Sequence, residues 1–205
     1  MNLHSQTQAL KAQTAQGISL ARSGLVQDDL KIYGIPLENL RTTATGQPLG
    51  ATAGTPAGAF GITYGTHGTA SPLVVGEAAS GNTKTDKARF QFPLPPEYVS
   101  GETVTLRVRC KEAVGAATVS TTIDAEVYEN DKDGAPAGSP TDLCATAAQD
   151  VTDTIGNKDF TVTPTGLVAG DMLDVELTGV TTDTGGTVGT VLTITSVEML
   201  LDIKG

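Results

Sequence analysis

Acidic residues alternate with other residues over 129–134, the arrangement in which calcium loops present their oxygen ligands. Asp131 and Asp133 are the candidate metal ligands of this stretch. An EF-hand loop that began at Glu129 would need a bidentate Glu at the position of Pro140. A solvated β-turn therefore explains the segment better than a calcium site, and we expect no metal and no cofactor.

Two pairs of carboxylates have a spacing that acid–base chemistry could use: Asp124 with Glu126, and Asp174 with Glu176. The members of each pair lie two residues apart in segments that alternate as strands do, so they share one face. That face is opposite the apolar residues of the same segments. We therefore predict that both pairs are solvated charge on an outer surface.

The histidines do not support nucleophilic catalysis. A Ser or Cys nucleophile needs a base, usually a His, held between it and a carboxylate. His4 lies near the N-terminus and His67 in a Gly-rich stretch, and neither position preorganises a general base. We expect no enzymatic activity.

The two cysteines, Cys110 and Cys144, are too few and too far from any His to form a zinc site. Cys110 continues the alternating apolar series Val104, Leu106 and Val108, which predicts a thiol in the core. A disulfide to Cys144 is possible if their strands are neighbours. Free buried thiols are the alternative, which assembly in the cytoplasm favours.

The net charge of −10 over 205 residues is unevenly distributed. Residues 1–41 carry four basic and three acidic side chains, whereas the rest of the chain carries nine basic and twenty acidic ones. Affinity for nucleic acid depends largely on Lys and Arg that neutralise phosphates. We therefore expect no nucleic-acid partner.

No apolar run approaches the roughly 18 residues that a membrane-spanning helix needs. The first residues lack the basic and apolar regions of a signal peptide. We expect no membrane partner and synthesis in the cytoplasm.

The elements that must position these residues are strands. Alternating apolar residues and Gly, Pro or Asp turns predict strands at 73–75, 89–92, 103–109, 119–127, 160–162, 173–177 and 192–203. A change of phase near Thr195 and Ser196 indicates a β-bulge. The prediction for 73–205 is a mainly β domain: an antiparallel β-sandwich, and specifically a jelly roll of about eight strands.

Residues 1–41 have a different character and are predicted to form a docking arm. Good helix formers over 5–16, followed by Gly17, predict a partly helical segment. The arm then presents apolar residues interrupted by Pro36, which we predict to bind a partner: Leu25, Val26, Leu30, Ile32, Ile35, Leu37 and Leu40. This apolar patch covers either the chain's own body or a neighbouring subunit.

Residues 42–72 are rich in Gly, Thr and Ala and are predicted to form an extended tether. Phe60, Ile62 and Tyr64 alternate and are the predicted anchors on a protein surface. A flexible linker without contacts is the alternative.

Two segments of the sequence resemble a known family. One is residues 90–102, FQFPLPPEYVSGE, which lead into the predicted strand 103–109; the other is residues 166–173, GLVAGDML, before a further strand. This layout of turns and strands over 73–205 resembles virion structural proteins of tailed bacteriophages, particularly jelly-roll capsid decoration (cement) proteins and the capsid-proximal parts of head fibres. The resemblance implies a homotrimer on the outside of an icosahedral shell, with the major capsid protein and neighbouring copies as partners.

The function predicted from the sequence is a non-enzymatic capsid decoration protein, located on the virion exterior and made in the host cytoplasm. The alternative is a receptor- or glycan-binding β-sandwich module of a fibre or cell-surface protein. Sugar platforms need exposed aromatic rings, and the chain has no Trp and only Tyr33, Tyr64, Tyr98 and Tyr128. We expect Tyr98 to pack a loop onto the edge of the sandwich. A third possibility is an ordinary monomeric β-domain whose arm packs on itself.

Overall fold

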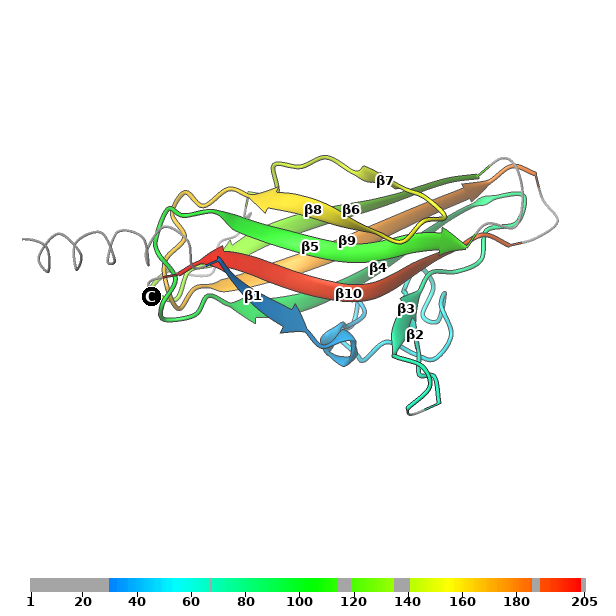
Figure 1. Ribbon diagram of the computed structural model, residues 1–205, viewed down its shortest axis with the longest axis horizontal. Coiled ribbons are helices and arrows are strands. Elements are labelled where there is room, and N and C mark those ends of the chain that lie inside the picture. The colour runs from blue at the N-terminus through cyan, green and yellow to red at the C-terminus, as the bar shows by residue number, and fades with distance from the viewer. Residues whose placement is uncertain (1–29, 67, 114–118, 135–140, 186–188, 204–205) are drawn as a thin grey trace, which may run out of the picture.

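The computed structural model describes residues 30–66, 68–113, 119–134, 141–185 and 189–203. Two antiparallel sheets face each other in this part of the chain and form a β-sandwich (Figure 1). One has six strands, in the order β2 (Gly61–Thr63), β3 (Leu73–Val75), β10 (Val191–Asp202), β5 (Val104–Ala113) and β8 (Gly156–Val162), with β1 (Leu30–Ile35) also paired to β10. The other has four, in the order β4 (Thr83–Pro93), β9 (Met172–Asp183), β6 (Val119–Asn130) and β7 (Gln149–Val151). The predicted fold class, an antiparallel β-sandwich of the jelly-roll type, is confirmed.

Alternating side chains build the core between the two sheets. In β5, Val104, Leu106 and Val108 are buried, whereas the residues between them are more exposed. β6 and β9 repeat this alternation on the facing sheet. Each sheet therefore has one apolar inner face and one polar outer face, as the sequence pattern predicts.

The predicted strands are present, and several extend beyond their predicted ends. The pairing of β10 with β5 shifts register between Ile194 and Ser196, which confirms the predicted bulge. β1, β2 and β7 are additional strands that are not among the predicted ones.

The predicted docking arm is, in its described part, an edge strand of the sandwich. β1 pairs antiparallel with the C-terminal half of β10 over its whole length. A 3-10 helix, η1 (Leu37–Asn39), follows, and Leu37 and Leu40 are buried in the core. No helix in the described part of the chain is long and apolar enough to span a membrane. The helix predicted over 5–16, and Leu25 and Val26, lie outside the described residues.

The predicted tether also contributes to the sandwich. β2 pairs with β3, and Phe60 and Ile62 are buried. Phe60 fills space beside Gly179 of β9, where an added Cβ would come within 2.7 Å of Phe60 Cζ. The described residues on both sides of position 72 therefore share one hydrophobic core. The division into an arm (1–41), a tether (42–72) and a sandwich (73–205) stays a prediction.

The two cysteines are free thiols. Cys110 is buried, as predicted for a core thiol, and burial raises its pKa to about 11. Cys110 pairs with Gly156 and Cys144 with Val162, at opposite ends of β8. At roughly 3.3 Å per residue those ends are about 20 Å apart, so the alternative of a disulfide does not hold.

The acidic segment after β6 forms a turn, as predicted. The Asp133 N–H donates to Asp131 Oδ1 at 2.7 Å, and the Gly134 N–H donates to the Asp131 carbonyl oxygen at 3.3 Å. Among the described residues, no group of three or more His, Cys, Asp or Glu is arranged to hold a metal ion. Asp131 therefore acts as a turn residue here.

Candidate functional site

The outer face of the four-stranded sheet carries a dense set of polar side chains. Alternate residues of β4, β9 and β6 point away from the core, because their neighbours are buried between the sheets. We call the central part of this surface the polar face; it consists of Lys87, Arg89 and Gln91 of β4, Asp174 and Glu176 of β9, and Asp124, Glu126 and Tyr128 of β6.

The strand register brings the two predicted carboxylate pairs together on the polar face. Glu126 of β6 lies opposite Glu176 of β9, and Tyr128 lies opposite Asp174. Like charges at facing positions repel each other. The position of these carboxylates therefore depends on donors from neighbouring side chains.

Two such donors hold the central carboxylates in place. Lys87 Nζ lies 2.5 Å from Glu176 Oε1, and this hydrogen bond raises the pKa of Lys87. The Tyr128 hydroxyl donates to Glu126 Oε2 at 2.9 Å, and this bond raises the pKa of Tyr128. Side chains that are already ordered lose less conformational entropy when a ligand binds.

A loop from the N-terminal part of the chain forms a wall beside β4, the edge strand of this sheet. The Arg41 and Arg89 N–H groups each donate to the other residue's carbonyl oxygen, at 2.8 and 2.9 Å. Farther along the strand, the Lys87 N–H donates to the Gly58 carbonyl oxygen at 2.8 Å. These bonds cover the β4 edge and hold segments 39–46 and 56–59 next to the polar face.

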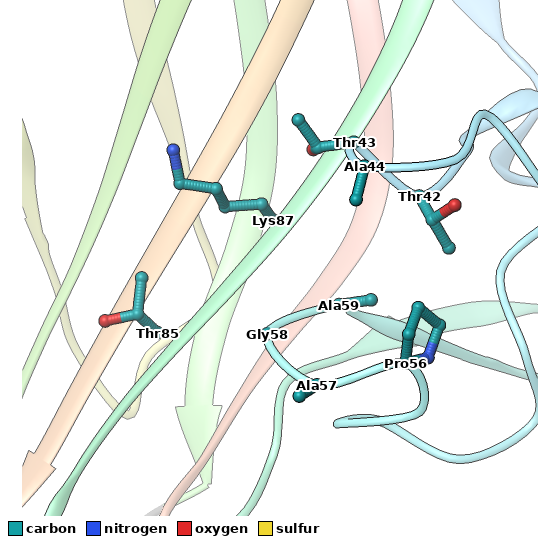
Figure 2. Close-up of a pocket in the computed structure, with 9 residues that line it drawn as sticks. All are labelled: Thr42, Thr43, Ala44, Pro56, Ala57, Gly58, Ala59, Thr85 and Lys87. Carbon is teal, nitrogen blue, oxygen red and sulfur yellow. The ribbon is translucent and has the colours of Figure 1, made fainter.

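Two pockets lie along this wall. The first has a volume of about 380 Å³ and lies between Thr85 and Lys87 of β4 and residues 42–44 and 56–59 (Figure 2). The hydroxyl oxygen of Thr43, one of its lining residues, is buried and has no hydrogen-bond partner within the described part of the chain. The second has a volume of about 350 Å³ and is lined by Asn39, Arg41, Gly46, Arg89, Phe90 and Gln91.

The two pockets follow one another along β4. Thr85 and Lys87 line the first, and Arg89 and Gln91 line the second. These are successive outward residues of the strand, which span about 20 Å at roughly 3.3 Å per residue. The wall and the polar face together therefore form one continuous candidate surface along β4.

The residues that the sequence predicts to bind a partner do not gather at this surface. Leu37, Leu40, Phe60 and Ile62 are buried in the chain's own core, because they supply apolar side chains to it; they are not accessible to a partner. Ile35 is partly buried.

Three other predicted partner-binding residues remain at the surface. Leu30 and Ile32 are 53% and 55% exposed on β1, and Tyr64 is 60% exposed after β2. Their role in binding stays a prediction. Tyr98 is buried, with its hydroxyl donating to the Glu102 carbonyl oxygen at 2.9 Å, which confirms that it packs a loop on the sandwich.

Sequence reasoning assigned the carboxylates to an outer face correctly but missed the basic residues and the tyrosine beside them. Lys87, Arg89 and Gln91 alternate with the buried Ala88 and Phe90. That alternation is a signal that could have extended the predicted strand 89–92 backwards and shown its outward side. Arg41 had no such signal, because its pairing with β4 is a long-range contact.

No protein-family model and no curated protein matches the sequence. The solved structures that are similar include the xylan-binding module CBM15, with 17% identity, a TM-score of 0.46, and coverage of 86% of this chain and 99% of that one. The CBM22-1 xylan-binding domain from Paenibacillus barcinonensis Xyn10C has 17% identity, a TM-score of 0.42, and coverage of 85% and 96%. TmCBM61 in complex with β-1,4-galactotriose has 8% identity, a TM-score of 0.39, and coverage of 85% and 89%. At these TM-scores and identities the likenesses say nothing about what this chain binds.

Proposed function

We propose that this chain is a non-catalytic glycan-binding module whose ligand lies along the wall beside β4 and across the polar face. The observation that carries the proposal is the convergence of ordered polar groups with two adjoining pockets on one surface. Lys87 belongs to both, because it lines the first pocket and holds Glu176 of the polar face.

The chemistry of this surface suits an oligosaccharide. Sugar hydroxyls both donate and accept hydrogen bonds, and carboxylates, amides and a lysine ammonium supply both partners. Charge-assisted bonds of this kind are stronger than bonds between neutral groups. The first pocket adds small apolar residues, Ala44, Pro56 and Ala57, against which the C–H face of a sugar ring can pack.

The same contacts support binding rather than hydrolysis. Glycosidases use one carboxyl group as an acid toward the leaving oxygen and a second carboxylate as nucleophile or base. Here Glu176 is bonded to Lys87, and Glu126 accepts the Tyr128 hydroxyl. In this function both groups act as hydrogen-bond acceptors for sugar hydroxyls.

A glycan array followed by calorimetry on the glycans that bind tests the proposal. Glu176→Gln removes the acceptor charge and its ion pair at the centre of the surface, and we expect it to weaken binding at least about tenfold, about 1.4 kcal/mol. Glu198→Gln makes the same change on the outer face of the six-stranded sheet and should leave affinity unchanged. Binding to no glycan, equal loss in both variants, or release of reducing sugar would contradict a non-catalytic module at this surface.

Capsid decoration is a second candidate, and the exposed pair Leu30 and Ile32 on the edge strand β1 is the observation that favours it. Edge strands with apolar side chains are ready to pair with another chain. In this function β1 contacts the major capsid protein or a neighbouring copy in a homotrimer on the virion exterior. Co-sedimentation with phage capsids that Ile32→Ser weakens would support it, and binding that is unaffected by this change would contradict it.

A further inference from the structure

Arg41 of the wall lies beside Arg89 of the polar face. Each residue's N–H donates to the other's carbonyl oxygen, so they form a directly opposed pair of an antiparallel bridge. Opposed residues of such a pair have their Cα atoms about 5.5 Å apart and their side chains on the same face. Both side chains line the second pocket.

Two positive charges at opposed positions are unfavourable unless something compensates them. Arg89 faces Glu176 on β9, but Lys87 occupies Oε1 of that carboxylate. No ion pair within the described part of the chain includes Arg41 or Arg89. Both guanidinium groups therefore keep donors available for a ligand, in a chain with a net charge of −10.

Other residues of the second pocket surround the two arginines. Asn39 and Gln91 add two side-chain amides to its lining. Gly46 adopts a φ of +67°, and a Cβ there would lie 3.2 Å from Arg89 Nη2. The Arg89 guanidinium therefore lies close to the backbone of the 42–47 turn. A side chain at position 46 would reduce the space available to this guanidinium.

We propose that this pocket binds the anionic group of an acidic glycan, either the carboxylate of a uronic acid or a sulfate ester. This inference rests on the proposed glycan-binding function and names the class of its ligand. A guanidinium presents a planar fork of N–H donors that matches the oxygens of carboxylate and sulfate. The two guanidinium groups and the amides of Asn39 and Gln91 together supply N–H donors for such an anionic group.

The charge of the remaining surface limits how densely the ligand is charged. Beyond Arg89, the polar face presents Asp174, Glu176, Asp124 and Glu126, which would repel an anion on every sugar. Neutral rings can accept or donate hydrogen bonds there. The ligand is therefore a glycan in which acidic groups are spaced along a neutral backbone.

Matched pairs of polymers test the inference without any change to the protein. Glucuronoxylan is compared with its carboxyl-reduced form, and a sulfated galactan with its desulfated form, by affinity electrophoresis and calorimetry. We expect at least tenfold tighter binding to one or both acidic members. The pair that shows this preference identifies whether the pocket takes the carboxylate or the sulfate.

The double variant Arg41→Gln, Arg89→Gln should abolish that preference, so that it binds the acidic and neutral members of each pair with equal affinity. Arg109→Gln, which removes one positive charge from the outer face of the six-stranded sheet, is the control and should keep the preference. A thermal unfolding scan of each variant confirms that the fold is retained. Equal affinity for acidic and neutral members, or loss of the preference in Arg109→Gln, overturns the inference but leaves glycan binding standing. Failure to bind any of the four polymers overturns the inference, whereas the glycan array decides the proposed function separately.

Discussion

Replacing Phe60 by Ala tests whether residues 42–72 are part of the core or a separate tether. Phe60 is fully buried, and it occupies the space that Gly179 leaves open beside β9. Truncating a buried Phe to Ala typically costs about 3–5 kcal/mol, because the lost transfer energy is joined by the cost of a cavity. For a chain of this size each kcal/mol lowers Tm by about 2–4 °C, so we expect a decrease of roughly 6–20 °C.

Urea unfolding followed by circular dichroism, together with calorimetry, measures this effect. Tyr64→Ala is the matched control, because Tyr64 comes from the same segment but its side chain is 60% exposed. We expect that change to alter the free energy of unfolding by no more than about 0.5 kcal/mol. A loss below about 1 kcal/mol for Phe60→Ala would refute the reasoning, since it would mean that the segment contributes little to the core.

Two further predictions concern titratable groups in the sandwich. Cys110 should react with a thiol reagent only after unfolding, because it is buried and its pKa is raised to about 11. Burial also raises the pKa of Cys144, but this thiol is only partly buried and should react in the native protein. Equal native rates in single Cys→Ala variants would contradict this. Burial raises the pKa of Asp86, whose Oδ2 accepts the Glu77 N–H at 2.6 Å, so the folded state holds this proton more tightly than the unfolded state does. The resulting stabilisation is present at acid pH and is lost as pH rises through the raised pKa. The free energy of unfolding of the wild type relative to Asp86→Asn should therefore fall from acid to neutral pH in urea titrations. A difference that is constant with pH would contradict this.

Local alternation was enough to predict most strands, because every second residue of a strand with one buried face is apolar. Val104, Leu106 and Val108 illustrate this, and so does the bulge at Ile194 and Ser196. The same reasoning failed for β1 and β2. Gly34 interrupts the alternation of Leu30 and Ile32, and the place of β1 and β2 in the sheet depends on pairing with β10 and β3, which no local signal records.

The candidate surface shows where prediction from a single sequence reaches its limit. The outward orientation of Glu126 and Glu176 was predictable from each strand, but their proximity depends on β6 and β9 being neighbours. Lys87 reaches Glu176 across 89 positions of the chain. A carboxylate that reads as ordinary solvated charge in the sequence becomes part of a cluster only when the strand order is known.

The Gly-rich composition of residues 42–72 has a physical explanation that differs from flexibility. This segment runs along the edge of β4, where the Gly58 carbonyl oxygen accepts the Lys87 N–H, and it also inserts Phe60 into the core. Such a path needs tight turns close to side chains, and Gly46 supplies one against the Arg89 guanidinium. A composition typical of a linker here builds the wall of the candidate binding surface. Residues 42–72, whose composition predicts few contacts, therefore contribute lining residues to both pockets.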